Sequence, residues 1–191
     1  MDTHQPLLAS AKTWAGWVAP ALVAHAGGLT RAGAVDLGSR VAVISTAKGG
    51  DSHADSGRVV VRYFDRTATG LRRAAAPEVS EGRASWGAAP AWKLRRDLAD
   101  TPVLQIAGGG TWQGVTCVWT ALVELDADAP REIIVALALH SSASGDGDYQ
   151  ARIAREGSGL KLVYTGAISR TFHLRWAGGR LVLGEAPPME C

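Results

Sequence analysis

After Gly33 the chain repeats one pattern, in which a short run of β-branched and aromatic residues is followed by a cluster of turn residues. Arg58–Phe64 is such a run, and Asp65–Gly70 after it is rich in residues that favour turns. β-branched and aromatic side chains favour strands, and Gly or Asp between two such runs favours a hairpin. The sequence therefore predicts an all-β protein, an antiparallel meander of about nine short strands arranged as a sandwich, a barrel or an incomplete propeller.

The clearest hairpin is predicted in the middle of the chain, where the apolar runs Val115–Leu125 and Glu132–Leu139 flank the turn Asp126–Pro130. Residues 133–139 are all apolar, whereas a strand with one face in water would alternate. We therefore expect this run to be a central strand covered on both faces. Two further hairpins are predicted to pair residues 149–155 with 160–164 and residues 171–176 with 180–183. Residues 74–91 are rich in Ala, Gly and Pro, and we expect a long loop there.

The chain length is that of one domain, and we expect residues 1–191 to form a single globular β domain. Its first 32 residues differ from the rest, because apolar residues recur there at helical steps until Pro20. These residues are Leu8, Ala11, Ala15 and Val18. We expect residues 1–32 to form a short helical or irregular segment that packs on the sheet.

The stretch Trp14–Leu29 contains no charged side chain apart from a possible charge on His25. It is too short for a bilayer and is interrupted by Pro20 and by glycines. The first ten residues contain no Lys or Arg, so the basic start of a secretory signal is missing. We expect no membrane span and no targeting segment. A cytoplasmic start and an exported domain that begins at Met1 both stay open, and a periplasmic or secreted location is favoured.

Charges are nearly balanced, with 20 Lys and Arg against 18 Asp and Glu and a formal net charge of +2. Such a balance supplies no field that would attract a polyanion. The arginine clusters near residues 72 and 95 flank apolar residues, which is typical of the solvated face of strands. We therefore expect no nucleic acid partner. The abundance of Ala and Arg is typical of a GC-rich genome, and we expect a bacterial source.

No group of residues has the spacing of a metal site. Asp146 with Asp148, and Asp51 with His53 and Asp55, lack the third acidic position and the distant Glu of an EF-hand. The five histidines lie far apart, and neither cysteine has a Cys or His at zinc spacing. We expect neither a metal nor a cofactor.

Cys117 and Cys191 are the only two cysteines. Cys117 lies in an apolar run, and Cys191 is the last residue of the chain. In an oxidising compartment a disulfide would tie the C-terminus to the sheet. In a reducing compartment Cys117 would be a buried free thiol. The sequence leaves both pairing states open.

The first candidate binding site is the polar loop that follows the expected central strand, since loops on a rigid scaffold often carry binding groups. It contains His, Ser and Asp, but residues of one loop lack the separate supports of a catalytic triad, and no Gly-x-Ser-x-Gly elbow occurs. We predict no catalytic residue. Binding is assigned to His140, Ser141, Ser142, Ser144, Asp146 and Asp148.

The second candidate is the glycine-rich segment Gly108–Gly114, which lacks the Lys-Ser/Thr ending of a phosphate loop. A wide loop with an indole and an amide at its tip would suit a partner or a sugar, and we assign binding to Trp112 and Gln113. A bulged hairpin with a packed Trp is the alternative. Four other tryptophans are expected at loop or strand edges (Trp86 and Trp92) or in the core (Trp119 and Trp176).

The function hypothesis is a non-enzymatic binding protein that presents loops from a β-scaffold to a macromolecule, with a protein partner favoured over a small molecule. An exported inhibitor or immunity-type protein would fit this description. Two alternatives stay open. One is a hydrolase of carbohydrates or esters that uses the 140–148 loop or the carboxylates Glu124 and Asp126. The other is a carrier of a small apolar ligand.

Overall fold

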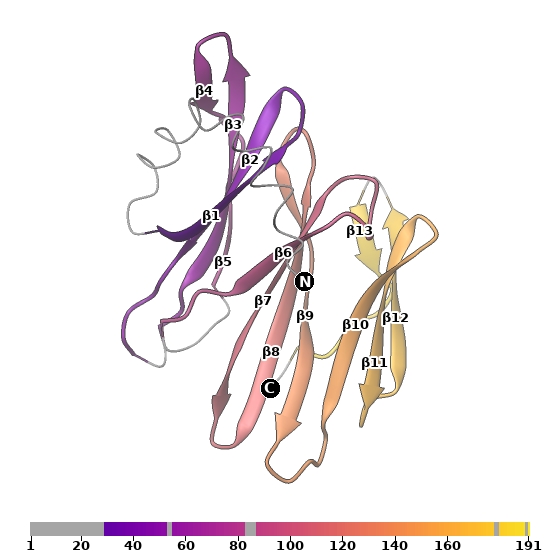
Figure 1. The fold of residues 1–191 in the computed structure, drawn as a ribbon. Coiled ribbons are helices and arrows are strands. Elements are labelled where there is room, and N and C mark those ends of the chain that lie inside the picture. The colour runs from indigo at the N-terminus through magenta and orange to yellow at the C-terminus, as the bar shows by residue number, and fades with distance from the viewer. Residues whose placement is uncertain (1–28, 53–54, 83–86, 178–179, 190) are drawn as a thin grey trace.

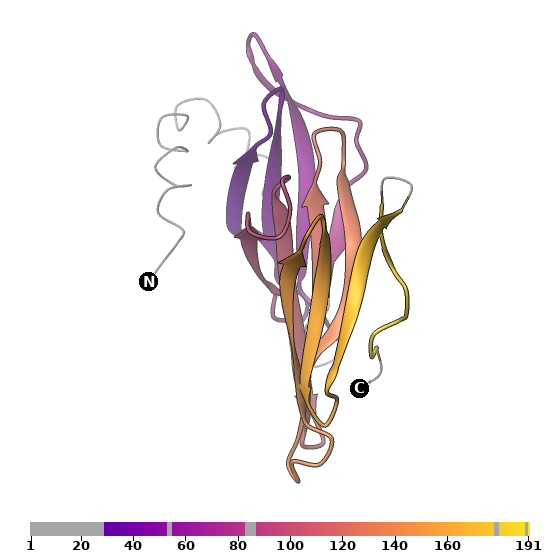
Figure 2. The ribbon, with the colours of Figure 1, turned by 90° about the vertical axis from the view of Figure 1, so that its right-hand side faces the viewer.

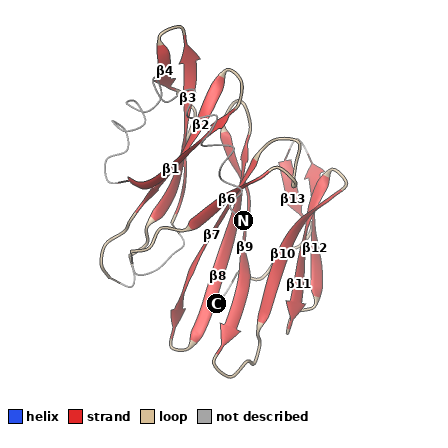
Figure 3. Cartoon of the chain, in the orientation of Figure 1, coloured by secondary structure: helices blue, strands red, loops and turns tan. Residues whose placement is uncertain are grey.

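The fold is all-β and antiparallel, as predicted (Figures 1 and 3). The computed structural model describes residues 29–52, 55–82, 87–177, 180–189 and 191. The expected N-terminal helix falls in residues 1–28, outside the described residues. The described part contains thirteen strands, more than the nine expected: β1 Leu29–Asp36, β2 Arg40–Ala47, β3 Arg58–Thr67, β4 Gly70–Arg73, β5 Val79–Glu81, β6 Ala91–Arg95, β7 Val103–Trp112, β8 Val115–Leu125, β9 Pro130–Ser142, β10 Tyr149–Glu156, β11 Gly159–Gly166, β12 Arg170–Ala177 and β13 Arg180–Leu183.

The strands form two antiparallel sheets. Sheet A has the order β1-β2-β3-β4, and β5 also pairs with β3. Sheet B has the order β13-β12-β11-β10-β9-β8-β7-β6, so every strand in it pairs with its neighbour in sequence. Tight turns between sequential strands explain this order, because a hairpin needs only a few residues to reverse the chain.

Sheet B folds back on itself between β9 and β10. These two strands share only two register pairs, Tyr149 with His140 and Gln150 with Leu139. Beyond that point the half of the sheet that holds β10–β13 lies against β9, and the Tyr164 hydroxyl donates to the Leu137 carbonyl at 2.9 Å. Sheet A, β6–β9 and β10–β13 therefore lie side by side as three layers (Figures 1 and 2).

Two apolar clusters join the layers. The first lies between sheet A and β6–β9 and includes Ile44, Tyr63 and Leu104. The second lies between β8–β9 and β10–β13. Val135 of β9 packs against the first cluster, whereas Leu137 belongs to the second. The apolar run of β9 therefore has neighbours on both faces, as predicted, although four of its seven side chains are only half-buried.

Three local expectations were wrong. Gly108–Gly110 is part of β7 instead of a wide loop, because a Cβ on Gly109 would lie 1.8 Å from the Cys117 carbonyl oxygen of β8. Val79–Glu81 forms a short strand within the segment expected to be loop. Trp92 lies in the core with 9% of its surface exposed, and its indole fills the space beside Gly33. In each case a contact with another strand determines the local structure: β8 for the glycines, β3 for Val79–Glu81 and β1 for Trp92.

The C-terminal residues form a strap that we define as Gly184–Cys191. The Leu137 amide donates to the Pro188 carbonyl at 3.1 Å, and the Trp119 indole N–H donates to the Met189 carbonyl at 3.4 Å. The strap thereby crosses β9 and reaches β8. None of the described residues forms a helix with the length and apolar character needed to cross a membrane.

Candidate functional site: the loop end of sheet B

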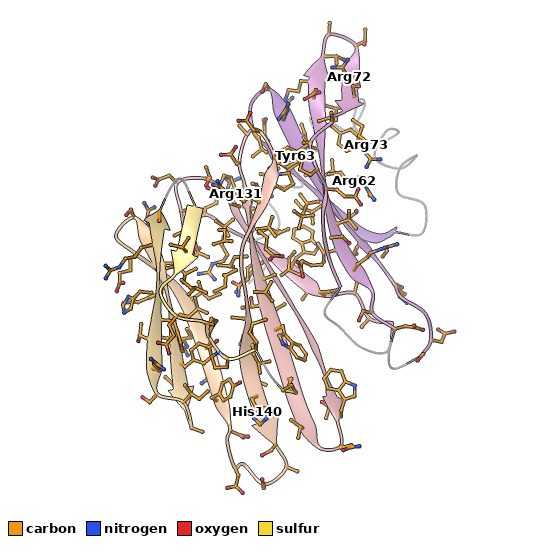
Figure 4. All side chains as sticks on the ribbon, turned by 180° about the vertical axis from the view of Figure 1, so that it is seen from behind. Arg62, Tyr63, Arg72, Arg73, Arg131 and His140 are labelled. Carbon is orange, nitrogen blue, oxygen red and sulfur yellow. A yellow bond between two sulfur atoms is a disulfide. The ribbon has the colours of Figure 1, made fainter. Side chains whose placement is uncertain are left out.

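The two segments that the sequence singled out separately lie side by side at one end of sheet B. One is the β7–β8 turn at Gln113 and Gly114, and the other is the β9–β10 loop from Ala143 to Gly147. The Ala143 amide donates to the Gly114 carbonyl at 3.0 Å, so the two segments are joined directly. We call residues 111–116 and 140–149 the loop end. Figure 4 shows its labelled member His140 at the end of the molecule opposite Arg72.

The β7–β8 turn is a two-residue hairpin with positive φ at both central residues, 50° at Gln113 and 82° at Gly114. Such turns match the twist of the flanking strands, and Gly is the residue that adopts positive φ without strain. Gln113 is exposed at the tip. Behind it, the hydroxyls of Thr111 and Thr116 lie 2.8 Å apart across the two strands.

Trp112 is half-buried at this hairpin rather than free in solvent. Its ring meets Trp119 edge to face, with the ring centroids 6.2 Å apart. Both indoles pack against the cluster beneath β8 and β9. The alternative of a hairpin with a packed Trp describes this side chain better than an exposed anchor. Gln113 is therefore the member of the pair that projects outward. The side chain of Trp176 and all of Trp86 lie outside what the structure describes.

The β9–β10 loop is organised by the carboxylate of Asp148. It accepts hydrogen bonds from the Ser142 amide at 2.7 Å and from the Ser141 hydroxyl at 3.1 Å. Asp is suited to this role because its short side chain reaches nearby backbone amides. Positive φ at Gly145 and Gly147 lets the chain reverse between them. Asp148 therefore has a structural role within the site.

Ser144 and Asp146 are exposed at the tip of this loop. The Ser142 hydroxyl donates to the Asp146 carbonyl at 2.9 Å and lies 3.2 Å from the Ser144 hydroxyl. The Asp146 amide donates to the Ser144 hydroxyl at 3.3 Å. These contacts hold the backbone in one shape while the Asp146 carboxylate faces solvent.

His140 is stacked on Tyr149, with the ring centroids 5.5 Å apart. Its Nδ1 is buried without a hydrogen-bond partner, and burial raises the pKa of Tyr149 above its usual value. The carboxylate of Asp148 bonds to serines instead of to this imidazole. A Ser-His-Asp triad needs the carboxylate to orient the His ring. The described geometry of the loop is therefore not that of a triad.

Electrostatically the loop end is acidic. Residues 110–118 and 138–150 contain no Lys or Arg, and their carboxylates are Asp146 and Asp148. A ligand at this end would meet negative charge and the hydroxyls of serines and threonines.

A disulfide between Cys117 and Cys191 anchors the base of the loop end. Cys117 is fully buried on β8, and its register partners are His140 on β9 and Gly110 on β7. The C-terminal strap is therefore tied covalently to the middle of the three strands that carry the loop end.

The carboxylates of the alternative hydrolase hypothesis lie at the other end of the β8–β9 hairpin. Glu124 is 4% exposed, accepts from the Thr101 hydroxyl at 2.6 Å and pairs with Arg131. It borders a depression of about 350 Å³ together with Glu132. Asp126 caps its own turn by accepting from the Asp128 amide at 2.9 Å. Both predicted carboxylates are thus held in structural contacts.

The described residues contain no cluster of three or more His, Cys, Asp or Glu side chains able to hold a metal ion. In one segment considered from sequence, the Asp55 carboxylate accepts from the Ser52 amide at 3.1 Å, as in an ordinary turn. His53 lies outside the described residues.

Thr111, Thr116 and Tyr149 belong to the loop end but were absent from the sequence-based assignment. Strand pairing was the signal for two of them, because Tyr149 pairs with His140 and Thr116 pairs with Ser141. Thr111 pairs with Thr116 in turn.

Searches with family models, curated proteins and solved structures find no match to this chain.

Proposed function

We propose that the protein binds a macromolecular partner through the loop end of sheet B and that it has no catalytic role there. The observation that carries the proposal is the direct bond between the two candidate segments, from the Ala143 amide to the Gly114 carbonyl. Together the segments offer one continuous surface with Gln113 and Asp146 exposed on it.

Support also comes from the internal hydrogen bonds of the β9–β10 loop. Asp148 and Ser142 hold the loop in shape without a ligand. A loop that is ordered before binding loses little conformational entropy on association, so more of its contact energy appears as affinity.

The favoured partner is a protein with a basic surface. The loop end is acidic, and complementary charge speeds encounter and selects among partners. This expectation agrees with an exported inhibitor or immunity-type protein that inserts a rigid acidic tip into a basic cleft. For the scaffold, we favour a layered sandwich over a barrel or a propeller, because sheet A packs face to face on β6–β9.

The test is a quantitative pulldown from an extract of the source organism with the wild type and two single variants. Asp146→Lys reverses the charge at the tip, and Asp51→Lys makes the same change in an exposed loop of sheet A. A specific partner should be recovered by the wild type and by Asp51→Lys, and at least tenfold less by Asp146→Lys.

Equal recovery of every protein by all three forms would contradict the proposal. A parallel assay of the wild type with ester and glycoside substrates addresses the hydrolase alternative. Turnover that is lost in Glu124→Gln and retained in Asp146→Lys would support that alternative instead.

A further inference from the structure

The last hairpin of sheet B leaves part of β12 without a neighbour on one side. β12 pairs with β11 back to its first residue, Arg170, which lies opposite Tyr164. Its register with β13 stops earlier, at Leu174 opposite Leu183. The chain bends away after Leu183, so β13 has four residues beside the eight of β12 (Figure 1). Among the described strands, none therefore continues the sheet beside residues 170–173.

Two residues of this stretch turn their backbone groups toward the open side. In the two-residue β10–β11 hairpin the closing pair Glu156–Gly159 is hydrogen-bonded, so the even-numbered residues of β11 bond to β12 instead. Their partners are the even-numbered residues of β12. Thr171 and His173 therefore direct their N–H and C=O groups away from β11. We call residues 170–173 the free edge of β12, and such an edge is a template for a further strand.

A groove of about 460 Å³ lies along the free edge, a volume within the range of ligand sites. Its lining consists of residues 170–173, 175 and 182–185, none of which belongs to the loop end. Val182 of β13 supplies apolar surface, because 44% of it is exposed. In the described part of the chain only Met189 is a second large apolar residue with such exposure.

The groove has one positive charge that the fold does not match. Arg170 pairs with Glu185. The Nδ1 of His173 lies 2.6 Å from a carboxylate oxygen of Glu156. Arg175 is exposed and forms no ion pair with any described residue. A carboxylate is the group that would pair with its guanidinium.

Glu185 shows how a carboxylate can be held in this groove. It lies at the bend after β13, and its carboxylate accepts from the Arg170 guanidinium. Both side chains are more than half exposed, and an exposed ion pair contributes little to stability. An incoming carboxylate can therefore take the place of Glu185 on Arg170.

We propose that the free edge of β12 accepts an extended acidic peptide segment of another protein as an added strand. The segment bonds to the backbone of Thr171 and His173, which gives affinity with little dependence on sequence. Side chains alternate along strands, so its residues opposite Thr171 and His173 share the face of Arg175. Acidic side chains at those positions pair with Arg175, and apolar ones between them lie beside Phe172. This second binding site goes beyond the function proposed for the loop end.

An NMR titration of the full-length protein tests the site. The probe is the hexapeptide Glu-Val-Glu-Val-Glu-Val with blocked ends. The amide signals of Thr171 and His173 should shift on its addition. A copy of the peptide with N-methylated glutamates lacks the donors that face β12 and should shift neither signal. Equal shifts with both peptides, or shifts with neither, would overturn the proposal.

Three variants separate pairing at this edge from general charge attraction. Arg175→Glu should weaken binding of the hexapeptide at least about fivefold, which is the contribution of one exposed ion pair. Glu185→Gln removes the competing carboxylate and should strengthen binding about twofold. Arg58→Glu makes the same charge reversal at an exposed residue of sheet A and should bind like the wild type.

Two results with these variants would refute the proposal. One is the same affinity in Arg175→Glu and Arg58→Glu, since the matched reversal would then show that position does not matter. The other is a shift of the Thr171 and His173 signals with protein concentration in the absence of peptide, which would assign the free edge to a second copy of the chain.

Discussion

The β8–β9 hairpin has two ends that differ in how their polar groups are used. At its closed end, residues 124–131, Glu124 pairs with Arg131, and the turn carbonyls accept hydrogen bonds from Arg40 and Tyr63 of sheet A. At the loop end, the Asp148 carboxylate accepts from Ser141 and from Ser142. The closed end joins the two sheets through its turn carbonyls, whereas the Asp148 carboxylate at the loop end holds its own segment and Asp146 faces solvent.

This difference separates structural polar groups from candidate binding groups. The charges and hydrogen-bonding groups of a buried ion pair already have partners within the fold, and a ligand would have to break the pair. An exposed carboxylate on an ordered loop can still offer its charge and its hydrogen-bond acceptors to a partner. Substitutions at the closed end should therefore change stability, and substitutions at the tip should change binding.

The largest effect is expected from Cys191→Ser, which removes the disulfide at the base of the loop end. The two cysteines are 74 residues apart in sequence, and a crosslink closing such a loop contributes about 4 kcal/mol. Urea unfolding of the oxidised wild type and of the variant measures the loss. If the variant matches the wild type, the strap is not a stabilising element. Relative to the wild type, hydrogen exchange in the variant should speed up more around Cys117 of β8 than at the closed-end turn.

The next effect is expected at the closed end. Glu124→Ala removes the carboxylate that accepts from Arg131 and from the Thr101 hydroxyl, and should cost about 2 kcal/mol. Glu132→Ala removes a neighbouring exposed carboxylate and should change the free energy of unfolding by less than about 0.5 kcal/mol. An equal loss in the free energy of unfolding in the two variants would show that the contacts of Glu124 do not stabilise the fold.

A smaller effect is expected for the carboxylate that organises the β9–β10 loop. Asp148→Ala removes the acceptor of the Ser142 amide and the Ser141 hydroxyl and should cost about 1.5 kcal/mol. Asp148→Asn keeps one carbonyl acceptor and should cost less. Asp146→Ala should leave stability unchanged within about 0.5 kcal/mol. A loss of stability in Asp146→Ala as large as in Asp148→Ala would contradict the division of roles between the two residues.

The smallest effect concerns pH near the closed end, where Arg95 bonds to Asp97 and to Gln105. The hydrogen bond from Arg95 lowers the pKa of Asp97 from 3.8 to about 2. A carboxylate with a lowered pKa stabilises the fold above its unfolded pKa, and this contribution is lost as the pH falls from 3.8 toward 2. Because the Asp97 carboxylate is exposed, the contribution of the pair should stay below about 1 kcal/mol. Urea midpoints at pH 4.5 and pH 2.5 should differ less in Asp97→Asn than in the wild type. An equal difference in the two proteins would show that the Arg95–Asp97 pair does not contribute to the pH dependence of stability.

Strand positions were readable from sequence wherever local pattern and turn chemistry agree. The β8–β9 hairpin and both C-terminal hairpins have partners in the structure close to those predicted. The apolar run in β9 correctly indicated burial on both faces. Patterns failed where glycines stand in a strand, because Gly109 is required by the Cys117 carbonyl opposite it and not by a turn.

The candidate site divides in the same way. Polarity and loop position indicated Gln113 and the 140–148 loop, but their adjacency follows from the register of β7, β8 and β9. Trp112 could not be placed by composition, since an indole beside a turn can either pack or project. Its contact with Trp119 depends on which face of the sheet the two side chains share.

By itself the sequence determined that this chain is a meander of hairpins, because strand propensity and turn residues act over a few neighbouring positions. Only the tertiary structure decided that two distant loops form one acidic end and that Cys117 meets Cys191. It also decided that Glu124 is satisfied internally while Asp146 is not. These outcomes depend on register, on the fold-back of sheet B and on burial, which are properties of segments far apart in the chain.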